Sequence, residues 1–236
     1  MAEKMLVPSI EQRLAGMLEV TRRMKDDAEG GKRLKPKPAV TISREFGCEA
    51  YPMAERLKEL LERKSGEPWV IMDKALLEET AKLHNISEEV FRTLGHRPRF
   101  LDEMVSTLTP RWKSEKDHYR LLCDQIVSLA SAGNVILIGR GSSIITQQLE
   151  NCYHFRIYAS HQFKVRSIAR RVNIPPQEAD HLIERKQKER DRFIRDFLDC
   201  DARDLSFYHL AINNDRSPAP KIAQIITDYI YLKPQE

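Results

Sequence analysis

A loop that could bind phosphate follows the first short apolar run of the chain. Residues 39–42 (AVTI) are mostly β-branched, residues 43–52 (SREFGCEAYP) form the loop, and a helical pattern begins at residue 53. A loop between a strand and a helix presents backbone N–H groups and the helix dipole to an anion. The standard phosphate loop is GxxxxGK[ST]. Here Gly47 alone stands at an expected place, with Ala50 where the lysine would be. On spacing alone, an ordinary strand-to-helix turn is the better interpretation.

Charged residues also follow two later apolar runs. Arg140 comes directly after residues 135–138 (VILI), the most apolar run of the chain, and Gly139. Its planar guanidinium suits the phosphate of a nucleoside monophosphate. The alternative is a surface arginine paired with an acid, but ligands in parallel sheets bind beyond the carboxyl ends of strands, which favours binding. Asp73 and Lys74 follow residues 69–72, where Asp73 either binds an acceptor group or caps the next helix.

Basic residues are concentrated between Arg166 and Arg195, where a ligand with several phosphates could be held. Glu184, Glu189 and Asp191 lie among them, so charge alone favours a solvated helix face with ion pairs. The net charge of +4 on 236 residues is small and does not indicate nucleic-acid binding by itself. The interleaved acids weaken the positive field further, which makes nucleic acid an unlikely partner.

The composition suits one domain with an insertion or a small lid. Hydrophobic residues make up 41% and charged residues 31%, which is typical of a soluble protein with a sizeable core. There is no apolar run long enough to span a membrane and no secretory signal at the N-terminus, so we expect a cytoplasmic protein. The four cysteines are far apart, without metal-ligand spacing, and are expected to be reduced thiols. No protein metal ligand is predicted.

Hydrophobic periodicity predicts five strands separated by helices. The strands are expected at residues 39–42, 69–72, 135–138, 155–158 and 208–212, and the helices at 53–64, 74–84, 118–132, 162–198 and 218–231. The fourth of these helices is broken by residues 173–176 (NIPP), and another helix is expected to start at Ser87. A further helix at 9–26 precedes a breaker-rich linker. This alternation predicts a parallel sheet with helices on both faces.

Four segments in order resemble the cytidylate-kinase-like family of P-loop nucleotide kinases. Residues 41–47 (TISREFG) resemble its ISREYG opening, and residues 72–77 (MDKALL) resemble YDKELI. Residues 133–141 (GNVILIGRG) are similar to GNVVIVGRGA, and residues 207–213 (FYHLAIN) to NYDLCINT. The resemblance covers about residues 38–226. It implies a P-loop kinase-like three-layer α/β/α fold with a five-stranded parallel sheet and a helical lid.

The resemblance also implies a domain organisation. Residues 1–37 would be an N-terminal helix and linker, and residues 38–236 the cytidylate-kinase-like domain. Within it, residues 95–120 would be an acceptor-side insertion and residues 163–198 the lid. The lid segment IERKQKER (183–190) is similar to the family's IxKxDKxR, with Gln187 in place of the aspartate. Phe193, Phe197 and Leu198 are expected to be core residues rather than a platform for a base.

The phosphate loop departs from the family at residues 48–51 (CEAY), which stand where the family has SGGR. Glu49 brings a carboxylate to a place where phosphate oxygens should approach, and the lost glycines restrict close backbone approach. Tyr51 replaces a basic residue, and Pro52 removes one N–H donor. Each change should weaken phosphate binding. Cys48 is interpreted as a small loop residue rather than a nucleophile.

By resemblance, the activity would be transfer of the ATP γ-phosphoryl group to CMP, dCMP or a related nucleotide, with Mg²⁺. The alternative is a catalytically weak or inactive nucleotide-binding regulatory protein on the same fold. The oligomeric state stays open. The implied catalytic residues are Arg140, Arg185, Lys188 and Arg190, and the implied acceptor-binding residues are Asp73, Lys74 and Arg140. The implied ATP-binding residues are Ser43, Arg44, Gly47, Cys48, Glu49, Ala50, Tyr51, Arg166 and Arg170.

Overall fold

A parallel sheet forms the centre of the protein in this computed structural model, which describes residues 37–75, 77 and 115–232. Its five strands lie in the order β2-β3-β1-β4-β5, and every neighbouring pair is parallel. The sequence prediction of a five-stranded parallel sheet is therefore confirmed. The strands are β1 (Ala39–Arg44), β2 (Val70–Met72), β3 (Val135–Ile138), β4 (Cys152–Tyr158) and β5 (Leu210–Asn213).

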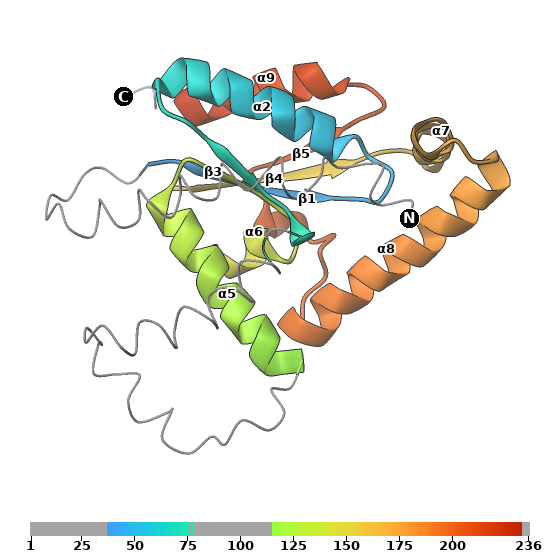
Figure 1. Cartoon of the computed structure of the whole chain (residues 1–236), viewed down its shortest axis with the longest axis horizontal. Helices are drawn as coiled ribbons and strands as arrows, with labels where there is room; N and C mark the ends of the chain where they lie inside the picture. Colours follow the sequence, from blue (N-terminus) through green and yellow to red (C-terminus); the bar gives the residue numbers. More distant parts are fainter. Residues whose placement is uncertain (1–36, 76, 78–114, 233–236) are drawn as a thin grey trace, which may run out of the picture.

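Helices cover both faces of the sheet (Figure 1). One face carries α2 and α9, and the other carries α5 and the short α6, while α7 and α8 form a hairpin beside the sheet. The short 3₁₀ segment η3 lies between α8 and β5. The helices are α2 (Ala50–Ser65), α5 (Glu115–Ala132), α6 (Ser142–Ile145), α7 (His161–Val172), α8 (Pro176–Leu198), α9 (Ala219–Tyr231) and η3 (Leu205–Phe207).

Alternate side chains of the central strands divide the core into two clusters. On β1, Val40 and Ile42 pack with α2 and α9, whereas Ala39 packs with α5. This is the expected period of two along a strand. Because both faces are covered, β2 and β3 are buried throughout and β1 and β4 are mostly buried, whereas the edge strand β5 is partly exposed. Both clusters contain side chains of the three central strands, so the carboxyl ends of β3, β1 and β4 are held firmly in place.

The α7–α8 hairpin turns where the sequence predicts a break. Asn173 adopts a left-handed conformation and its N–H bonds Ala169 O, while Pro176 begins the next helix. Apolar contacts then fix α8 at two places. Its first half packs Ala179 and Ile183 against Phe46, and its last turns contact the α5 cluster through a set of larger side chains, Phe193, Phe197 and Leu198. These three are partly buried and pack against the core, so the hairpin is packed onto the domain.

Several element boundaries differ from the sequence expectation. β4 begins at Cys152 rather than at residue 155, because Asn151 and Cys152 already pair with β1. β5 begins at Leu210 rather than at residue 208, since Tyr208 N–H closes the 3₁₀ turn on Leu205 O. The expected helix at 9–26, most of the helix at 74–84, the start at Ser87 and most of the 95–120 insertion lie outside the described residues. None of the described helices is long and apolar enough to cross a membrane.

Candidate functional site

The loop from Glu45 to Glu49 joins the end of β1 to the start of α2. The first helical hydrogen bond runs from Met53 N to Glu49 O at 3.2 Å, so the amides of the first turn face the loop. Their partial positive charge attracts an anion. Ala50 and Tyr51 supply this turn, while Pro52 has no N–H to contribute. The arrangement expected from the sequence, a strand, a loop and a helix N-terminus, is present here.

Amides of this loop are already bonded to side chains of the protein. Phe46 N–H donates to Gln187 Oε1 at 2.9 Å, and Glu49 N–H donates to Asn214 Oδ1 at 2.9 Å. Cys48 N–H points to Glu45 O at a longer 3.4 Å. A phosphate oxygen that used the amides of Phe46 and Glu49 would have to displace two side-chain oxygens first. Sequence reasoning noted Gln187 only as a departure and missed Asn214.

Gly47 holds a position that requires glycine for two reasons. Its φ is 101°, which L side chains rarely adopt. In addition, a Cβ at this position would lie 2.7 Å from Lys164 Cβ, a distance that real Cβ atoms do not tolerate. Gly47 therefore lets α7 approach the loop closely. The sequence had indicated an approach of phosphate at this residue instead.

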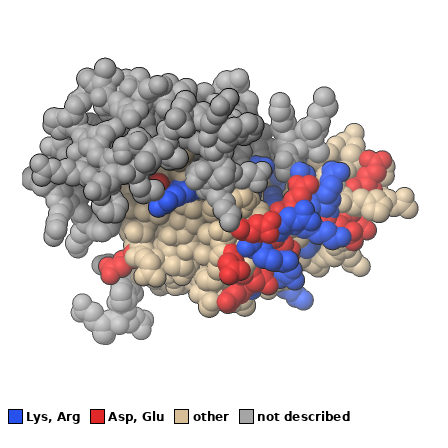
Figure 2. All heavy atoms as spheres, turned by 90° about the horizontal axis from the view of Figure 1, so that it is seen from below, with Lys and Arg blue, Asp and Glu red and all other residues tan. Residues whose placement is uncertain are grey.

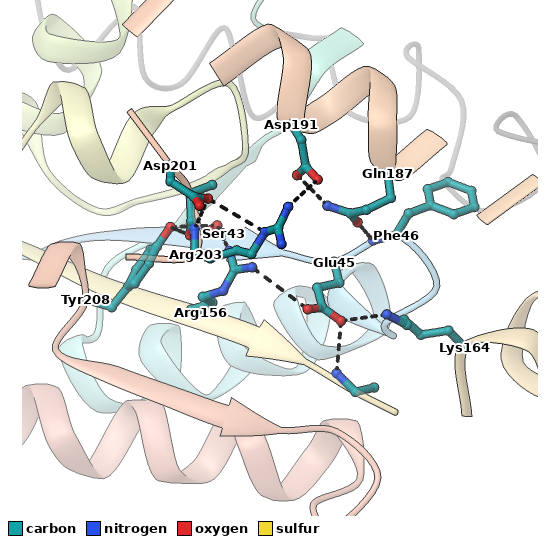
Figure 3. Close-up of polar contacts among 12 residues, drawn as sticks. Ser43, Glu45, Phe46, Arg156, Lys164, Gln187, Asp191, Asp201, Arg203 and Tyr208 are labelled. Atoms are coloured by element: carbon teal, nitrogen blue, oxygen red, sulfur yellow. Dashed lines mark hydrogen bonds and ion pairs between the residues drawn. The ribbon is translucent and has the colours of Figure 1, made fainter. Parts of the chain in front are cut away.

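Cations of the α7–α8 hairpin face the loop, and Figure 3 shows one of them, Lys164, beside Glu45. Lys164 Nζ lies 2.8 Å from Glu45 Oε2, and Arg170 Nη2 lies 2.9 Å from Glu49 Oε1. On α8, the Arg190 guanidinium lies 4.9 Å from the centre of the Phe46 ring, a cation–π contact. The hairpin thus brings Lys164, Arg170 and Arg190 to the helix N-terminus, although sequence reasoning had not singled out Lys164.

The other expected lid cations lie elsewhere. Arg166, Arg185 and Lys188 are exposed, and none has a contact to the loop among the contacts of the described residues. Figure 2 shows that basic and acidic side chains alternate over the exposed face of α8. This face is therefore a mixed-charge helix surface, and it forms no continuous basic stripe of the kind that tracks a nucleic-acid backbone.

Two arginines lie at the carboxyl end of β3. Arg140 has its guanidinium carbon 4.3 Å from the centre of the Phe193 ring, and Tyr119 Oη lies 3.4 Å from Arg140 O. The guanidinium of Arg44 lies across Gly139, where any side chain would collide with it. Since β3 and β1 are neighbours in the sheet, Arg140 and Arg44 belong to one edge. Both are therefore placed where ligands of parallel sheets bind.

Asp73 and Lys74 lie at the end of the edge strand β2. Asp73 is buried and its carbonyl accepts a bond from Leu77 N–H at 2.9 Å, which starts a helical turn. Lys74 is exposed. The sheet order places these two residues beyond β3, on the side of Arg140 that is away from the loop.

A polar stripe lies on the α5 face of the sheet, and of its members the sequence had indicated only Ser43, as an ATP-binding residue. Arg156 on β4 is buried, and its Nη1 donates to Ser43 Oγ on β1 at 3.1 Å. Tyr208 Oη lies 3.0 Å from the same Ser43 Oγ, as Figure 3 shows. Two residues earlier, Thr41 Oγ1 lies 2.8 Å from His154 Nδ1. The signal in the sequence was an arginine inside the apolar run of residues 155–158.

Two buried side chains of this region, Cys48 and His154, have shifted pKa values that argue against a role as reactive groups. Burial, with Glu45 nearby, raises the pKa of the Cys48 thiol to about 12, so the thiolate is scarce at neutral pH and the thiol is a poor nucleophile. Burial, with His209 nearby, lowers the pKa of His154 to about 4. His154 is therefore neutral at physiological pH and acts as a hydrogen-bonding residue of the core.

An open depression of about 560 Å³ adjoins the loop and is lined by Ser160, Asn213, Asp215 and Arg216. The carboxylate of Asp215 accepts bonds from Ser160 N–H at 2.5 Å and from Ser160 Oγ at 2.8 Å. These bonds tie the loop after β5 to the start of α7. Asn214, the next residue along, is the one that bonds Glu49 N–H.

The described residues do not fit a protein-held magnesium site. Among them, no group of three or more His, Cys, Asp or Glu side chains could hold a metal ion. The two carboxylates nearest the loop are engaged by cations, Glu45 by Lys164 and Glu49 by Arg170. Oxygen ligands that Mg²⁺ would need are therefore committed to ion pairs.

Comparisons with known proteins agree with this architecture. Residues 39–216 match the model of the Cytidylate kinase-like family. An uncharacterized protein from Eubacterium ventriosum shares the fold, with a TM-score of 0.62 and 18% identity over 82% of this chain and 98% of that chain. No curated protein matches.

Two further crystal structures are similar at a lower level. Shikimate kinase from Bacteroides thetaiotaomicron has a TM-score of 0.43 and 13% identity over 83% of this chain and 99% of that one. TT1252 from Thermus thermophilus has a TM-score of 0.42 and 18% identity over 84% and 100%. At this level neither bears on function.

Proposed function

The chain belongs to the cytidylate kinase-like family, and from this membership and the geometry of the β1–α2 loop we propose that it transfers the γ-phosphoryl group of ATP to CMP, dCMP or a related nucleotide. The observation that carries the proposal is the position of Lys164, Arg170 and Arg190 opposite the N-terminus of α2. A helix N-terminus facing cations is a site for a polyphosphate.

In this mechanism the protein positions and neutralises the phosphates. The first-turn amides of α2 bind phosphate oxygens of the donor, and Lys164 and Arg190 stabilise the charge that spreads over the transferred group. Both cations have carboxylate or aromatic partners at present, which they would share with the ligand. Phosphoryl transfer needs little covalent help, so we assign no general base. Any Mg²⁺ would arrive with the nucleotide and would neutralise phosphate charge there.

The acceptor and the donor base are assigned to flanking sites. Arg140, beside Arg44 at the end of β3, would bind the phosphate of the acceptor nucleotide through its planar fork. The depression lined by Ser160, Asn213, Asp215 and Arg216 adjoins the loop. The donor base would occupy it, because Asn214 connects this depression to the start of α2.

A coupled ADP-release assay over a panel of nucleoside monophosphates tests the proposal. We expect turnover with a pyrimidine monophosphate. Arg190→Gln should lower kcat/KM by about tenfold to a thousandfold, since it removes a group placed to stabilise the transferred phosphate. Arg192→Gln is the matched control, because Arg192 is an exposed residue of the same helix. Equal activity of the two variants would contradict the role of Arg190.

The second candidate is a nucleotide-binding regulatory protein with weak or no turnover. It is favoured by the amides of Phe46 and Glu49, which are bonded to Gln187 and Asn214, and by the Glu49 carboxylate at the loop. Under this alternative, ATP binds at the loop, but no ADP forms with any acceptor. A binding titration beside the turnover assay distinguishes the two.

A further inference from the structure

The charge on Arg156 lacks full compensation among the described residues. The side chain is only 7% exposed, and a guanidinium stays protonated in proteins. Its nearest carboxylate is Glu45, with 3.9 Å between Arg156 Nη2 and Glu45 Oε1. That carboxylate is already bonded at 2.8 Å to Lys164 and also accepts from Ala159 N–H at 3.4 Å. Two cations therefore share one anion.

The hydrogen bonds of Arg156 are also fewer than its donors. A guanidinium carries five N–H donors. Within the described part of the chain, its one hydrogen bond is that from Nη1 to Ser43 Oγ at 3.1 Å. The ring of Tyr208 lies 5.7 Å from the guanidinium carbon, which is a weak cation–π contact at most. A buried charge with so little compensation is costly to the fold.

The position of Arg156 suggests why a destabilising buried charge is present here. Ser43 and Arg156 are register partners in β1 and β4, near the carboxyl ends of the strands, where parallel sheets bind ligands. The pair two residues earlier, Thr41 and His154, satisfies itself with a 2.8 Å hydrogen bond and a neutral imidazole. Departures from a self-consistent core concentrate at functional sites.

We propose that Arg156, with the hydroxyl of Ser43, forms a second oxyanion site, separate from the α2 N-terminus, that takes the phosphate group of a small ligand. Figure 3 shows the guanidinium between Ser43 and Glu45, with the Tyr208 hydroxyl on the Ser43 side. The planar fork of Arg156 matches two oxygens of a phosphate. The phosphate would supply the negative charge that the residues around the Arg156 guanidinium do not fully provide.

The test measures thermal unfolding in a low-salt buffer while inorganic phosphate is titrated, on the full chain and without nucleotide. The wild type should gain thermal stability in a saturable way. Arg156→Met should unfold at the same or a higher temperature than the wild type without phosphate, because it removes an under-compensated buried charge. It should also bind phosphate at least about tenfold more weakly. Arg156→Lys keeps the charge but lacks the fork, and should weaken phosphate binding to an intermediate degree.

His154→Gln is the matched control, because it changes a buried polar residue of the same strand face two positions away. It should lower the unfolding temperature and leave the phosphate response intact. Isothermal titration of inorganic phosphate and of CMP gives the affinities directly. A response to either probe that Arg156→Met removes supports the site, since the two share the same phosphate chemistry.

Four results would overturn the proposal. They are a wild type that responds neither to phosphate nor to CMP, an unchanged response in Arg156→Met, a strong loss of stability or failure to fold in Arg156→Met without ligand, and an equal response to acetate. A strong loss of stability would mean that Arg156 only stabilises the fold, and an equal response to acetate would indicate a general carboxylate-binding site. Because no step uses ATP or turnover, the protein can fail as a kinase and still pass this test, and the reverse also holds.

Discussion

The two faces of the sheet use the same strands in different ways. On the face toward α2 and α9, Ile42 pairs with Phe155 in register, and both are fully buried. On the opposite face the neighbouring pair is Ser43 with Arg156. The first face is apolar and the second carries a polar stripe, although both are buried. The α2–α9 face is therefore purely a packing surface, while the α5 face gives up some stability for polar groups near the ligand edge.

Phe155→Ala should produce the largest change. The side chain is fully buried and its ring packs edge-on to Tyr229, with 5.7 Å between ring centres. Deleting a buried phenylalanine ring costs about 3–5 kcal/mol of unfolding free energy. Urea denaturation measures it. Arg156→Met, one residue along on the other face, should cause no comparable loss. Similar losses for both variants would mean that the two faces have the same role.

His154 should make stability depend on pH. Its folded pKa of about 4 lies below the ordinary value of 6.5, so the unfolded chain takes up the proton first. This lowers the unfolding free energy as pH falls from about 6.5 toward 4, by about 2 kcal/mol at most at pH 5. Denaturation at pH 7.5 and 5 checks the value. His154→Gln should flatten this slope, and an unchanged slope would exclude His154 as its source.

The apolar packing on both faces could be predicted from the sequence almost entirely, whereas the polar stripe on the α5 face could not. β-branched runs such as residues 39–42 and 135–138 mark buried parallel strands without any tertiary information. The hairpin break at residues 173–176 was equally visible, because proline and asparagine act locally. In contrast, the contact between Arg156 and Ser43 could not be predicted, because it depends on the order of the strands in the sheet. Ser43 and Arg156 are far apart in the sequence and meet only because β1 and β4 are neighbours.

At the candidate site too, local features could be predicted from the sequence, whereas contacts between distant segments could not. Gly47 and the α2 N-terminus could be found from local sequence, since a loop and a helix start are local features. Which cations reach them could be predicted only in part: the resemblance named Arg170 and Arg190 but not Lys164, because the facing side of each helix depends on its packing. Arg190 and Gln187 face the loop, whereas Arg185 and Lys188 are exposed. Periodicity gives spacing along a helix, but the side of α8 that packs is set by its contacts with Phe46 and α5.

Glu49→Gln should strengthen nucleotide binding by about tenfold. The substitution keeps the shape of the side chain but removes a negative charge from the loop and releases Arg170, now 2.9 Å away, toward a phosphate. Isothermal titration with ATP measures the effect. Glu59→Gln is the control on the same helix, because it also removes a carboxylate from an arginine pair. Weaker binding by Glu49→Gln would show that this carboxylate supports the site.

Gln187→Ala should have the smallest effect. It removes the 2.9 Å bond from Phe46 N–H and leaves that amide open to a phosphate oxygen. One net hydrogen bond is worth about 1 kcal/mol, so ATP affinity should rise about fivefold. Fluorescence titration with a labelled nucleotide checks it. If affinity falls instead, the Gln187 contact assists ligand binding and the α8 face of the loop is already in its binding arrangement.

The central claim is that the loop after β1 and the α7–α8 hairpin enclose a polyphosphate. The most direct measurement is a titration of ATP followed by amide NMR signals of Phe46, Gly47 and Glu49. We predict saturable shifts at these three residues, together with shifts around Arg190 on the facing helix. Saturating ATP that leaves all of these signals unchanged would contradict the account.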